Sequence, residues 1–207
     1  MIFNDEIDAC QECANLINAN RLKITEKPYV TFKVEEKWLP QKGVNILFVA
    51  ESPPWNGKQS YFYNAAQTSK RTNLRKEMFR HLYLPSLEAF RDKSYFLVDA
   101  IKCRLNKKDK SNVPSEVLKK CSAEFLGREI KMLKPKTIFV LGDSAKKALQ
   151  CLHHTIGFSE FADLTKHRVT QDFDRVLSGY RVILCVYPGG QTRKHEANIR
   201  RAFSKLE

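Results

Sequence analysis

The stretch ILFVAESPPWNGKQSYFY, residues 46–63, begins as an unbroken apolar run and stops abruptly at a carboxylate followed by two prolines. Its first part, Ile46 to Ala50, is too short for a stand-alone helix and rich in branched side chains, so it predicts a strand buried on both faces of a sheet. Glu51 follows at the carboxyl end of that strand. Because ligands bind outside the carboxyl ends of strands in open α/β sheets, we expect Glu51 and Ser52 to line a crevice.

Aromatic residues follow this strand and would form a wall of the same crevice. They are Trp55, Tyr61, Phe62 and Tyr63. Such a wall suits a flat, partly apolar substrate with a polar edge. Ordinary core packing of these rings, with Glu51 solvated, explains the same residue types, and both interpretations stand at this point.

Three further apolar runs predict strands. They are Tyr95 to Ile101, which Asp99 interrupts near its end, Thr137 to Gly142, and Arg181 to Tyr187. The last run follows a hairpin signal at Ser178 and Gly179. Helical patterns separate the runs, and strands joined by helical crossovers form a parallel sheet covered on both faces. The sequence therefore predicts an α/β fold, a three-layer sandwich with a central four-stranded, mostly parallel sheet and helices on both faces.

The length of 207 residues predicts a single domain over residues 1–207. Residues 1–45 form its N-terminal part, in which an amphipathic helix is followed by a mixed polar connection. We expect this connection, residues 23–45, to be irregular, with a short strand over Tyr29 to Val34.

Charge is the unusual feature of the composition, because 36 Lys and Arg residues against 23 Asp and Glu residues give a formal net charge of +13. Residues 1–45 contain 6 basic and 7 acidic residues, so the excess lies in the α/β part. A strongly basic chain points to a polyanionic partner. A membrane surface is the competing polyanion, but we find no long apolar segment, signal peptide or basic amphipathic helix. We expect a nucleic-acid-binding, cytoplasmic monomer that does not associate with membranes.

Six cysteines without a secretory signal argue against a disulfide framework, and their spacing indicates a metal site instead. Cys10 and Cys13 form a C-x2-C pair on one face of the predicted N-terminal helix, while Cys103 and Cys121 follow far downstream. The other two cysteines stand in apolar surroundings and are predicted to be small buried side chains. These are Cys151 and Cys185.

The loop after the last predicted strand carries a phosphate-binding pattern. Gly189 and Gly190 can present backbone amides, and Arg193 and Lys194 follow at the start of a basic helix. The carboxyl ends of parallel strands meet at one edge of a sheet, so this loop would lie beside Glu51. A glycine turn that leads into a solvated basic helix is the alternative.

The order of these strand-end motifs, together with the cysteine spacing, resembles the iron-sulfur uracil-DNA glycosylases, the family 4 and family 5 branches of that superfamily. Those enzymes carry an N-terminal C-x2-C, a Lys-Cys-Arg after the second strand and another cysteine downstream; Lys102, Cys103 and Arg104 form the Lys-Cys-Arg here. The resemblance implies one 4Fe-4S cluster on soft thiolate ligands. The ligands would be Cys10, Cys13, Cys103 and Cys121. A zinc ion on the same side chains, or four free thiols, would explain the same spacing.

The first motif of that family, Gly-Glu-Ala-Pro-Gly, corresponds to Ala-Glu-Ser-Pro-Pro at residues 50–54, so Glu51 keeps the carboxylate while both glycines are replaced. The aromatic residue that stacks on the extruded base in the family corresponds best to Phe62, with Tyr63 as the second candidate. These correspondences imply that Glu51 is catalytic and that Ser52, Phe62 and Tyr63 bind the substrate.

Two positions depart from the family pattern. Where family 4 has an asparagine that reads uracil, four residues before the third cysteine, this chain has Asp99. An ionised aspartate accepts hydrogen bonds but cannot donate one, so it cannot read the uracil O4 as the amide does. The His-Pro-Ser/Ala motif of the family appears as Tyr187-Pro188-Gly189. We expect an ionised Asp99 and a substrate base other than plain uracil.

The resemblance predicts a monofunctional DNA glycosylase of base excision repair, which extrudes a deaminated or damaged base and hydrolyses its N-glycosidic bond. The base leaves a cationic sugar behind, which Glu51 would stabilise, with Asp99 as the second candidate, while Tyr187 would donate to the leaving base. The DNA contacts would come from Arg104, Gly189, Gly190, Arg193 and Lys194. A catalytically silent, cluster-bearing nucleic-acid-binding protein on the same scaffold is the alternative.

Overall fold

The structure is a computed structural model, and it describes residues 3–19, 22–54, 61–64, 73–106, 113–189 and 192–206. Its centre is a five-stranded sheet with the order β3-β2-β5-β7-β6, in which the first four run parallel and β6 is antiparallel to β7. The strands are β2 (Ile46–Ala50), β3 (Tyr95–Asp99), β5 (Thr137–Leu141), β6 (Asp174–Leu177) and β7 (Tyr180–Cys185).

The predicted α/β class agrees with this sheet, but the sheet has five strands where the sequence predicts four. The four apolar runs are the four parallel strands. The additional strand is β6, the first arm of the hairpin whose turn is Ser178 and Gly179, with φ angles of 52° and 81°. Its residues are mostly polar or exposed because it forms an edge of the sheet, so it lacks the apolar run that marks the others.

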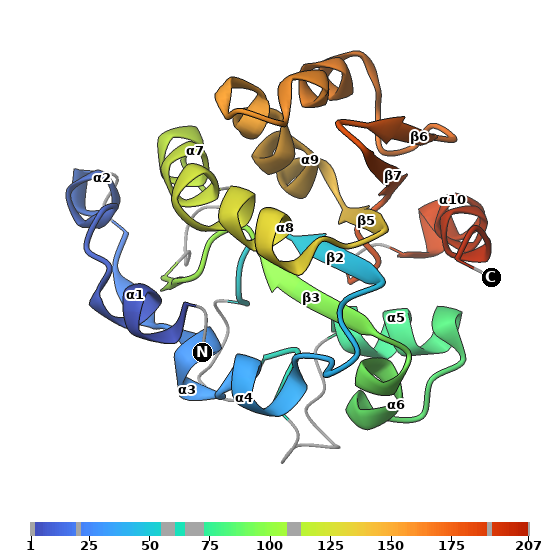
Figure 1. The fold of residues 1–207 in the computed structure, drawn as a ribbon, viewed down its shortest axis with the longest axis horizontal. Coiled ribbons are helices and arrows are strands. Elements are labelled where there is room, and N and C mark those ends of the chain that lie inside the picture. The colour runs from blue at the N-terminus through green and yellow to red at the C-terminus, as the bar shows by residue number, and fades with distance from the viewer. Residues whose placement is uncertain are drawn as a thin grey trace.

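Helices cover both faces of the sheet (Figure 1). On one side lie α7 (Ser115–Cys121), α8 (Gly127–Leu133) and α9 (Asp143–Gln150), and on the other α5 (Asn73–Leu82), α6 (Leu87–Asp92) and α10 (Thr192–Ser204). A π-helical turn, Ser122–Leu126, joins α7 to α8, and the 3-10 segments Cys151–His154 and Ser159–Lys166 follow α9. The arrangement agrees with the predicted three-layer sandwich.

The core side chains explain how the layers hold the strands in place. Every residue of β2 is buried, and the ring of Phe48 packs against Tyr95 of β3 and against rings from three further elements. These are Phe90 of α6, Phe139 of β5 and Phe203 of α10, at centroid separations of 5.5, 5.2 and 6.5 Å. Full burial of a side chain of this size contributes about 2–3 kcal/mol relative to exposure. This packing therefore holds the central strands in place along their length, up to their carboxyl ends.

The N-terminal part contains α1 (Asn4–Ala9), α2 (Ala14–Ala19), α3 (Pro28–Thr31) and α4 (Val34–Trp38). The predicted single helix through Cys10 and Cys13 is thus two short helices, with both cysteines in the turn between them. The predicted strand over Tyr29 to Val34 is wrong, because Pro28 occupies the first position of α3, where its fixed φ suits a helix.

A short strand lies earlier in the chain than predicted. β1 (Ile24–Glu26) pairs antiparallel with β4 (Arg104–Leu105), and Ile24 stands opposite Leu105. This second, two-stranded sheet places the N-terminal part beside the segment that follows β3. It therefore brings the first cysteine pair towards Cys103.

Candidate active site and cysteine cavity

Two neighbouring strands bring the predicted carboxylates to one edge of the sheet. Ala50 of β2 pairs in register with Asp99 of β3, and the backbone N–H of Ile101 donates to the Glu51 carbonyl at 2.9 Å just beyond the strands. The half-buried Glu51 also accepts from Ser52, whose Oγ lies 3.3 Å from Oε1. Glu51 and Asp99 thus stand at the carboxyl ends of adjacent parallel strands, where ligands bind in such sheets.

Asp99 is 6% exposed, and burial raises the pKa of its carboxyl to about 7. The charge of Lys102 opposes this rise and the charge of Glu129 adds to it, while Arg104 and a hydrogen bond with Tyr61 lower the pKa further. The expectation of an ionised Asp99 stays a prediction, because with this pKa the neutral and the ionised forms are both populated near pH 7. The cause of the raised pKa is the burial of Asp99, which its neighbours in the sequence do not indicate.

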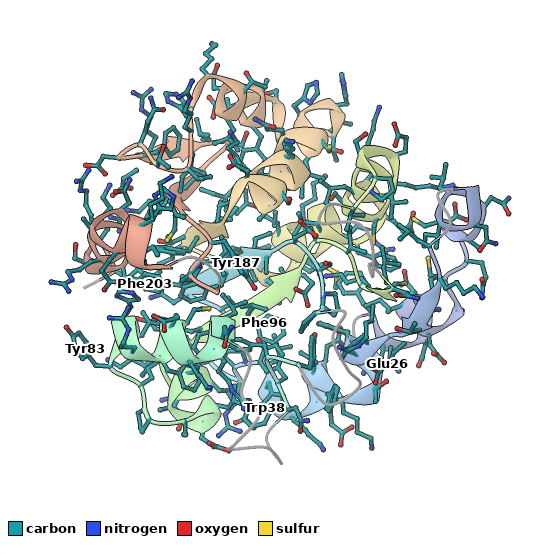
Figure 2. All side chains as sticks on the ribbon, turned by 180° about the vertical axis from the view of Figure 1, so that it is seen from behind. Glu26, Trp38, Tyr83, Phe96, Tyr187 and Phe203 are labelled. Carbon is teal, nitrogen blue, oxygen red and sulfur yellow. The ribbon has the colours of Figure 1, made fainter. Side chains whose placement is uncertain are left out.

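Tyr187, labelled in Figure 2, follows β7. Its side chain lies against two glycines. A Cβ on Gly189 would stand 2.6 to 2.8 Å from the Tyr187 ring, and one on Gly142, whose φ is +91°, would stand 3.0 Å from the Tyr187 Cβ. Although 43% of Tyr187 is exposed, its hydroxyl end lies over Gly189 and loses water there. This desolvation, with the charges of Asp99 and Glu51, raises the pKa of Tyr187 to about 12. The hydroxyl is therefore protonated at neutral pH, within electrostatic reach of both carboxylates.

The aromatic residues after β2 divide between the core and the site. Phe62 packs edge-on against core rings, and the hydroxyl of Tyr63 bonds the backbone of Leu97 on β3, with both residues at most 3% exposed. Core packing occupies both rings, which is the alternative that the residue types leave open. Tyr61 is as buried as Phe62 and packs against Phe32, but it also reaches the site through its hydrogen bond with Asp99. Its place in the same aromatic run is the only sign of this role in the sequence.

Arg104 lies inside the protein, although the sequence suggests a DNA contact. Its side chain is 2% exposed, its Nε donates to Glu26 Oε2 at 2.9 Å, and its Nη1 donates to the Pro54 carbonyl. Arg104 thus ties β1 and the loop after β2 to the segment that follows β3. The expected DNA contact is corrected, because a buried guanidinium on these internal acceptors does not reach a phosphate.

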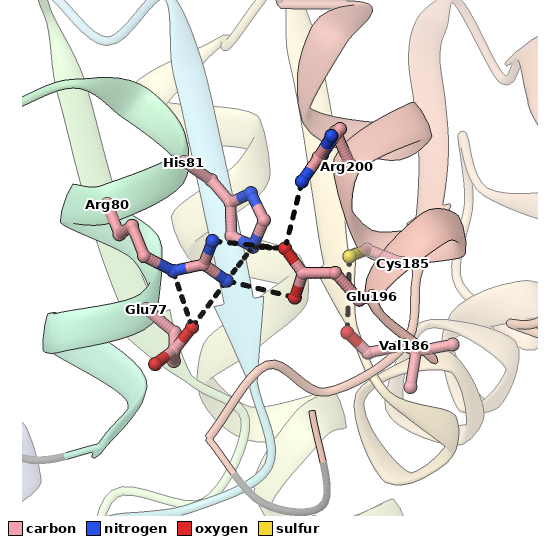
Figure 3. Close-up of polar contacts among 7 residues, drawn as sticks. All are labelled: Glu77, Arg80, His81, Cys185, Val186, Glu196 and Arg200. Atoms are coloured by element: carbon pink, nitrogen blue, oxygen red, sulfur yellow. Dashed lines mark hydrogen bonds and ion pairs between the residues drawn. The ribbon is translucent and has the colours of Figure 1, made fainter. Parts of the chain in front are cut away.

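Figure 3 shows how the C-terminal helix is held on α5. Arg80 donates from Nη1 and Nη2 to the two carboxylate oxygens of Glu196 on α10, at 3.0 and 2.9 Å, and its Nη2 also bonds Glu77 at 2.8 Å. This fork-shaped geometry orients α10 relative to α5. Lys194 and Arg200 lie exposed on α10, so the helix presents basic side chains to solvent as predicted.

Several predicted contacts lie outside the described residues. They are Trp55, Gly190, the side chain of Arg193 and residues 107–110 of the basic loop.

Within the described ranges, the helices are too short or too polar to cross a membrane.

All four predicted metal ligands line one cavity of about 20 Å³. They are Cys10, Cys13, Cys103 and Cys121, and apolar side chains such as Ile7 and Phe125 complete the wall. Burial raises the pKa of Cys103 to about 11 and that of Cys121 to about 12, so metal binding would have to displace thiol protons. Among the residues that the structure describes, no three His, Cys, Asp or Glu side chains are placed to hold a metal ion.

The other two cysteines stand apart from the lining of this cavity. Cys185 is buried as predicted, and its Sγ donates to the Val186 carbonyl at 3.1 Å (Figure 3). Cys151 is only half-buried, because it begins the 3-10 segment at the end of α9.

A buried ion pair beside Asp99 is absent from the sequence-based predictions. Lys102 and Glu129 are each at most 2% exposed, and Lys102 Nζ lies 2.6 Å from Glu129 Oε2. A lysine at the start of a basic loop carries no local signal of burial, since its partner comes from α8.

Comparison with known families places this geometry in context. The family model described as Uracil DNA glycosylase superfamily matches residues 37–206. The matched region contains both carboxylates, Tyr187 and the second cysteine pair, whereas Cys10 and Cys13 precede it. No curated protein matches the chain.

Proposed function

The chain belongs to the uracil DNA glycosylase superfamily, and from that premise we propose that it is a monofunctional DNA glycosylase. It would hydrolyse the N-glycosidic bond of a deaminated or damaged base that has been turned out of the DNA, as the first step of base excision repair. The observation that carries this proposal is the convergence of Glu51, Asp99 and Tyr187 at the carboxyl edge of the parallel sheet.

The three side chains supply what the reaction requires. Breaking the bond between base and sugar leaves positive charge on the sugar and negative charge on the base. Glu51 stabilises the cationic sugar or orients the attacking water, because it is a half-buried carboxylate fixed at the end of β2. Tyr187 keeps its proton at neutral pH and donates a hydrogen bond to the departing base.

Asp99 determines which base is accepted. In its neutral form it donates to a ring carbonyl and accepts from a ring N–H, as an amide does, whereas the ionised form only accepts. The burial that raises the pKa of Asp99 to about 7 favours the neutral form below that pH. We therefore propose a base with adjacent N–H and C=O groups, which includes uracil, hypoxanthine and xanthine.

We also propose that Cys10, Cys13, Cys103 and Cys121 hold one 4Fe-4S cluster. Four sulfur donors around a largely apolar cavity support the choice of a soft iron-sulfur group. The group would serve to tie the N-terminal part to the segment after β3 and to α7.

DNA is the proposed partner of a cytoplasmic monomer, and the basic face of α10 is its proposed contact. The net charge of +13 and the exposed Lys194 and Arg200 support this assignment. Gly189 would let the backbone approach a phosphate beside the extruded nucleotide.

A panel of oligonucleotides tests the proposed activity directly. Each carries one uracil, hypoxanthine, xanthine or mismatched thymine, and alkali then cleaves the abasic sites that the protein has made. We expect release of a base with adjacent N–H and C=O groups, and loss of this release in Glu51→Gln. Tight binding of the same oligonucleotides without base release from any of them would instead identify a silent DNA-binding protein.

A further inference from the structure

Lys102 connects two parts of the molecule that the proposed function treats separately. Its ammonium group is buried, donates to the backbone oxygen of Asp99 at 2.7 Å and to Glu129 Oε2 at 2.6 Å, and lies 5.5 Å from the centre of the Tyr29 ring. The carbonyl of Asp99 and the carboxylate of Glu129 are thus held by one cation. Three fixed contacts leave Lys102 little freedom to move independently of them.

The same residue forms part of the cysteine cavity. Lys102 lines that cavity, and its backbone N–H forms a hydrogen bond with the thiol of Cys121. Its neighbour in sequence, Cys103, lines the cavity as well. Lys102 therefore touches the thiols with its backbone and the active-site strand with its side chain.

We propose that Lys102 is the positioning residue for Asp99, and that through it a displacement of the cysteine cavity is transmitted to the active-site carboxyl. This inference deepens the proposed function and rests on it, because it assigns a support to the group that reads the base. No catalytic contact with DNA is assigned to Lys102, which is buried beneath the site.

The charges around Asp99 explain why the position of the Lys102 ammonium group affects the pKa of Asp99. Positive charges face Asp99 from Lys102 and from Arg104 on β4, and a negative charge faces it from Glu129 on α8. Phenolic side chains that interact with Asp99 complete its surroundings, namely Tyr61, Tyr63 and Tyr187. In a buried site a single charge shifts a neighbouring pKa strongly, so the placement of one ammonium group matters. Moving that group would also leave Glu129 buried without its counter-charge, which is costly.

The protonation of Asp99 itself is the appropriate measurement, because it does not require base release. A protonated carboxyl gives its own infrared band, and the difference between wild type and Asp99→Asn isolates the band of this residue. We expect a wild-type midpoint near pH 7. Lys102→Met should raise the midpoint by about one pH unit, because a cation is lost, whereas Glu129→Gln should lower it. Midpoints that stay unchanged or move in the same direction would overturn the proposal.

A matched double variant keeps the test informative if the single variant fails to fold. Lys102→Met with Glu129→Gln replaces both members of the buried pair by neutral groups, which is tolerated better than removing one member. Because Lys102 outweighs Glu129 in its effect on Asp99, we expect the midpoint to rise in this variant too, by less than in the single one. An unchanged midpoint in the double variant would also count against the proposal.

The transmission step is tested from the cysteine side. Cys121→Ser changes the group that accepts from the Lys102 N–H, so we expect it to move the Asp99 midpoint. Cys151→Ser lies outside the cavity and serves as the control, in which the midpoint should stay at the wild-type value. Equal midpoints in the two variants would show that the cavity does not act on Asp99. A protein that releases no base can still give these shifts, so failure of the proposed function is recognised separately.

Discussion

Tyr61 forms a hydrogen bond with the side chain of Asp99, so one part of this carboxyl is already engaged by the protein. Burial and the charge of Asp99 raise the pKa of Tyr61 well above its usual value, and the phenol therefore remains the donor. An oxygen that accepts from Tyr61 is a poor place for a proton. In neutral Asp99 we therefore expect the proton on the other oxygen.

Asp99→Asn is expected to remove the pH dependence of base release. In the proposed mechanism neutral Asp99 reads the base, so activity on uracil-containing DNA should fall as pH rises through about 7, where Asp99 loses its proton. An amide has the same donor and acceptor pattern at every pH, so Asp99→Asn should retain activity and show a flat profile. Single-turnover rates from pH 5.5 to 8.5 test this. Activity that instead falls towards low pH, with an inactive Asp99→Asn, would show that the ionised form acts.

Glu51→Gln should lower the rate of base release by about 10²- to 10⁴-fold, because the charge that stabilises the cationic sugar is lost. The variant should keep its affinity for the same DNA, since the backbone of β2 is unchanged. Glu36→Gln, an exposed site on α4, is the matched control. A Glu51→Gln enzyme as fast as the Glu36→Gln enzyme would remove Glu51 from the mechanism.

Gly189→Ala should displace the Tyr187 ring, which would stand within 2.8 Å of the new methyl group. The ring is 43% exposed and can swing outward, so we expect a change in the free energy of unfolding below about 1 kcal/mol. Base release should fall by about tenfold, to the level of Tyr187→Phe, because both changes remove the same hydroxyl from the site. The double variant should be no slower than either single variant. Losses that multiply in the double variant would contradict this shared cause.

Substitution of any one cavity cysteine by serine should lower the iron and sulfide content and the melting temperature of anaerobically purified protein. The reason is that each ligand joins segments distant in sequence. Cys151→Ser, outside the cavity lining, should leave the metal content unchanged. Element analysis with an assay for inorganic sulfide provides the measurement. One equivalent of zinc without sulfide would assign the four thiolates to a zinc site.

Lys194→Ala should weaken DNA binding uniformly across base sequences. Loss of one phosphate contact should reduce the slope of log K against log salt by about 0.9 for duplex DNA. Lys33→Ala removes an exposed lysine next to α4 and should leave the slope unchanged. Titrations at several salt concentrations compare the two variants. Equal slopes for both would place the DNA-binding surface away from the start of α10.

The sequence predicts well those parts of the fold in which a single sequence pattern determines the element. Continuous apolar runs identify the four parallel strands because a strand covered on both faces has no polar alternation. The edge strand β6 escapes the same rule, since Arg175 and Val176 are exposed to solvent. Pro28 is compatible with both a strand start and the first turn of a helix, and only packing of the N-terminal part decides between them.

Within the site, residue types predict the edge of the sheet but not the directions of side chains in the loops. Tyr61, Phe62 and Tyr63 are equally suitable for stacking and all three are buried, so only the hydrogen bond between Tyr61 and Asp99 connects one of them to the site. The protonation of Asp99 depends first on its burial and then on the charges of Lys102 and Glu129, and no local pattern reveals the burial or the contribution of Glu129 from α8. Arg104 is predicted at the surface because its ion-pair partner, Glu26, is distant in sequence and no local pattern indicates the pair.

The arrangement of the sheet and the cavity also sets an order of events on the ribosome. Cys10 and Cys13 emerge long before Cys103, by on the order of several seconds at about 5–20 residues per second. The nascent chain therefore carries an isolated thiol pair that must stay reduced until the opposite wall arrives. Tyr187 emerges later still, just after β7, the strand that lies between β5 and β6. We expect translating ribosomes to display both carboxylates without the hydroxyl of Tyr187, so that the proposed base release would begin only when synthesis is almost finished.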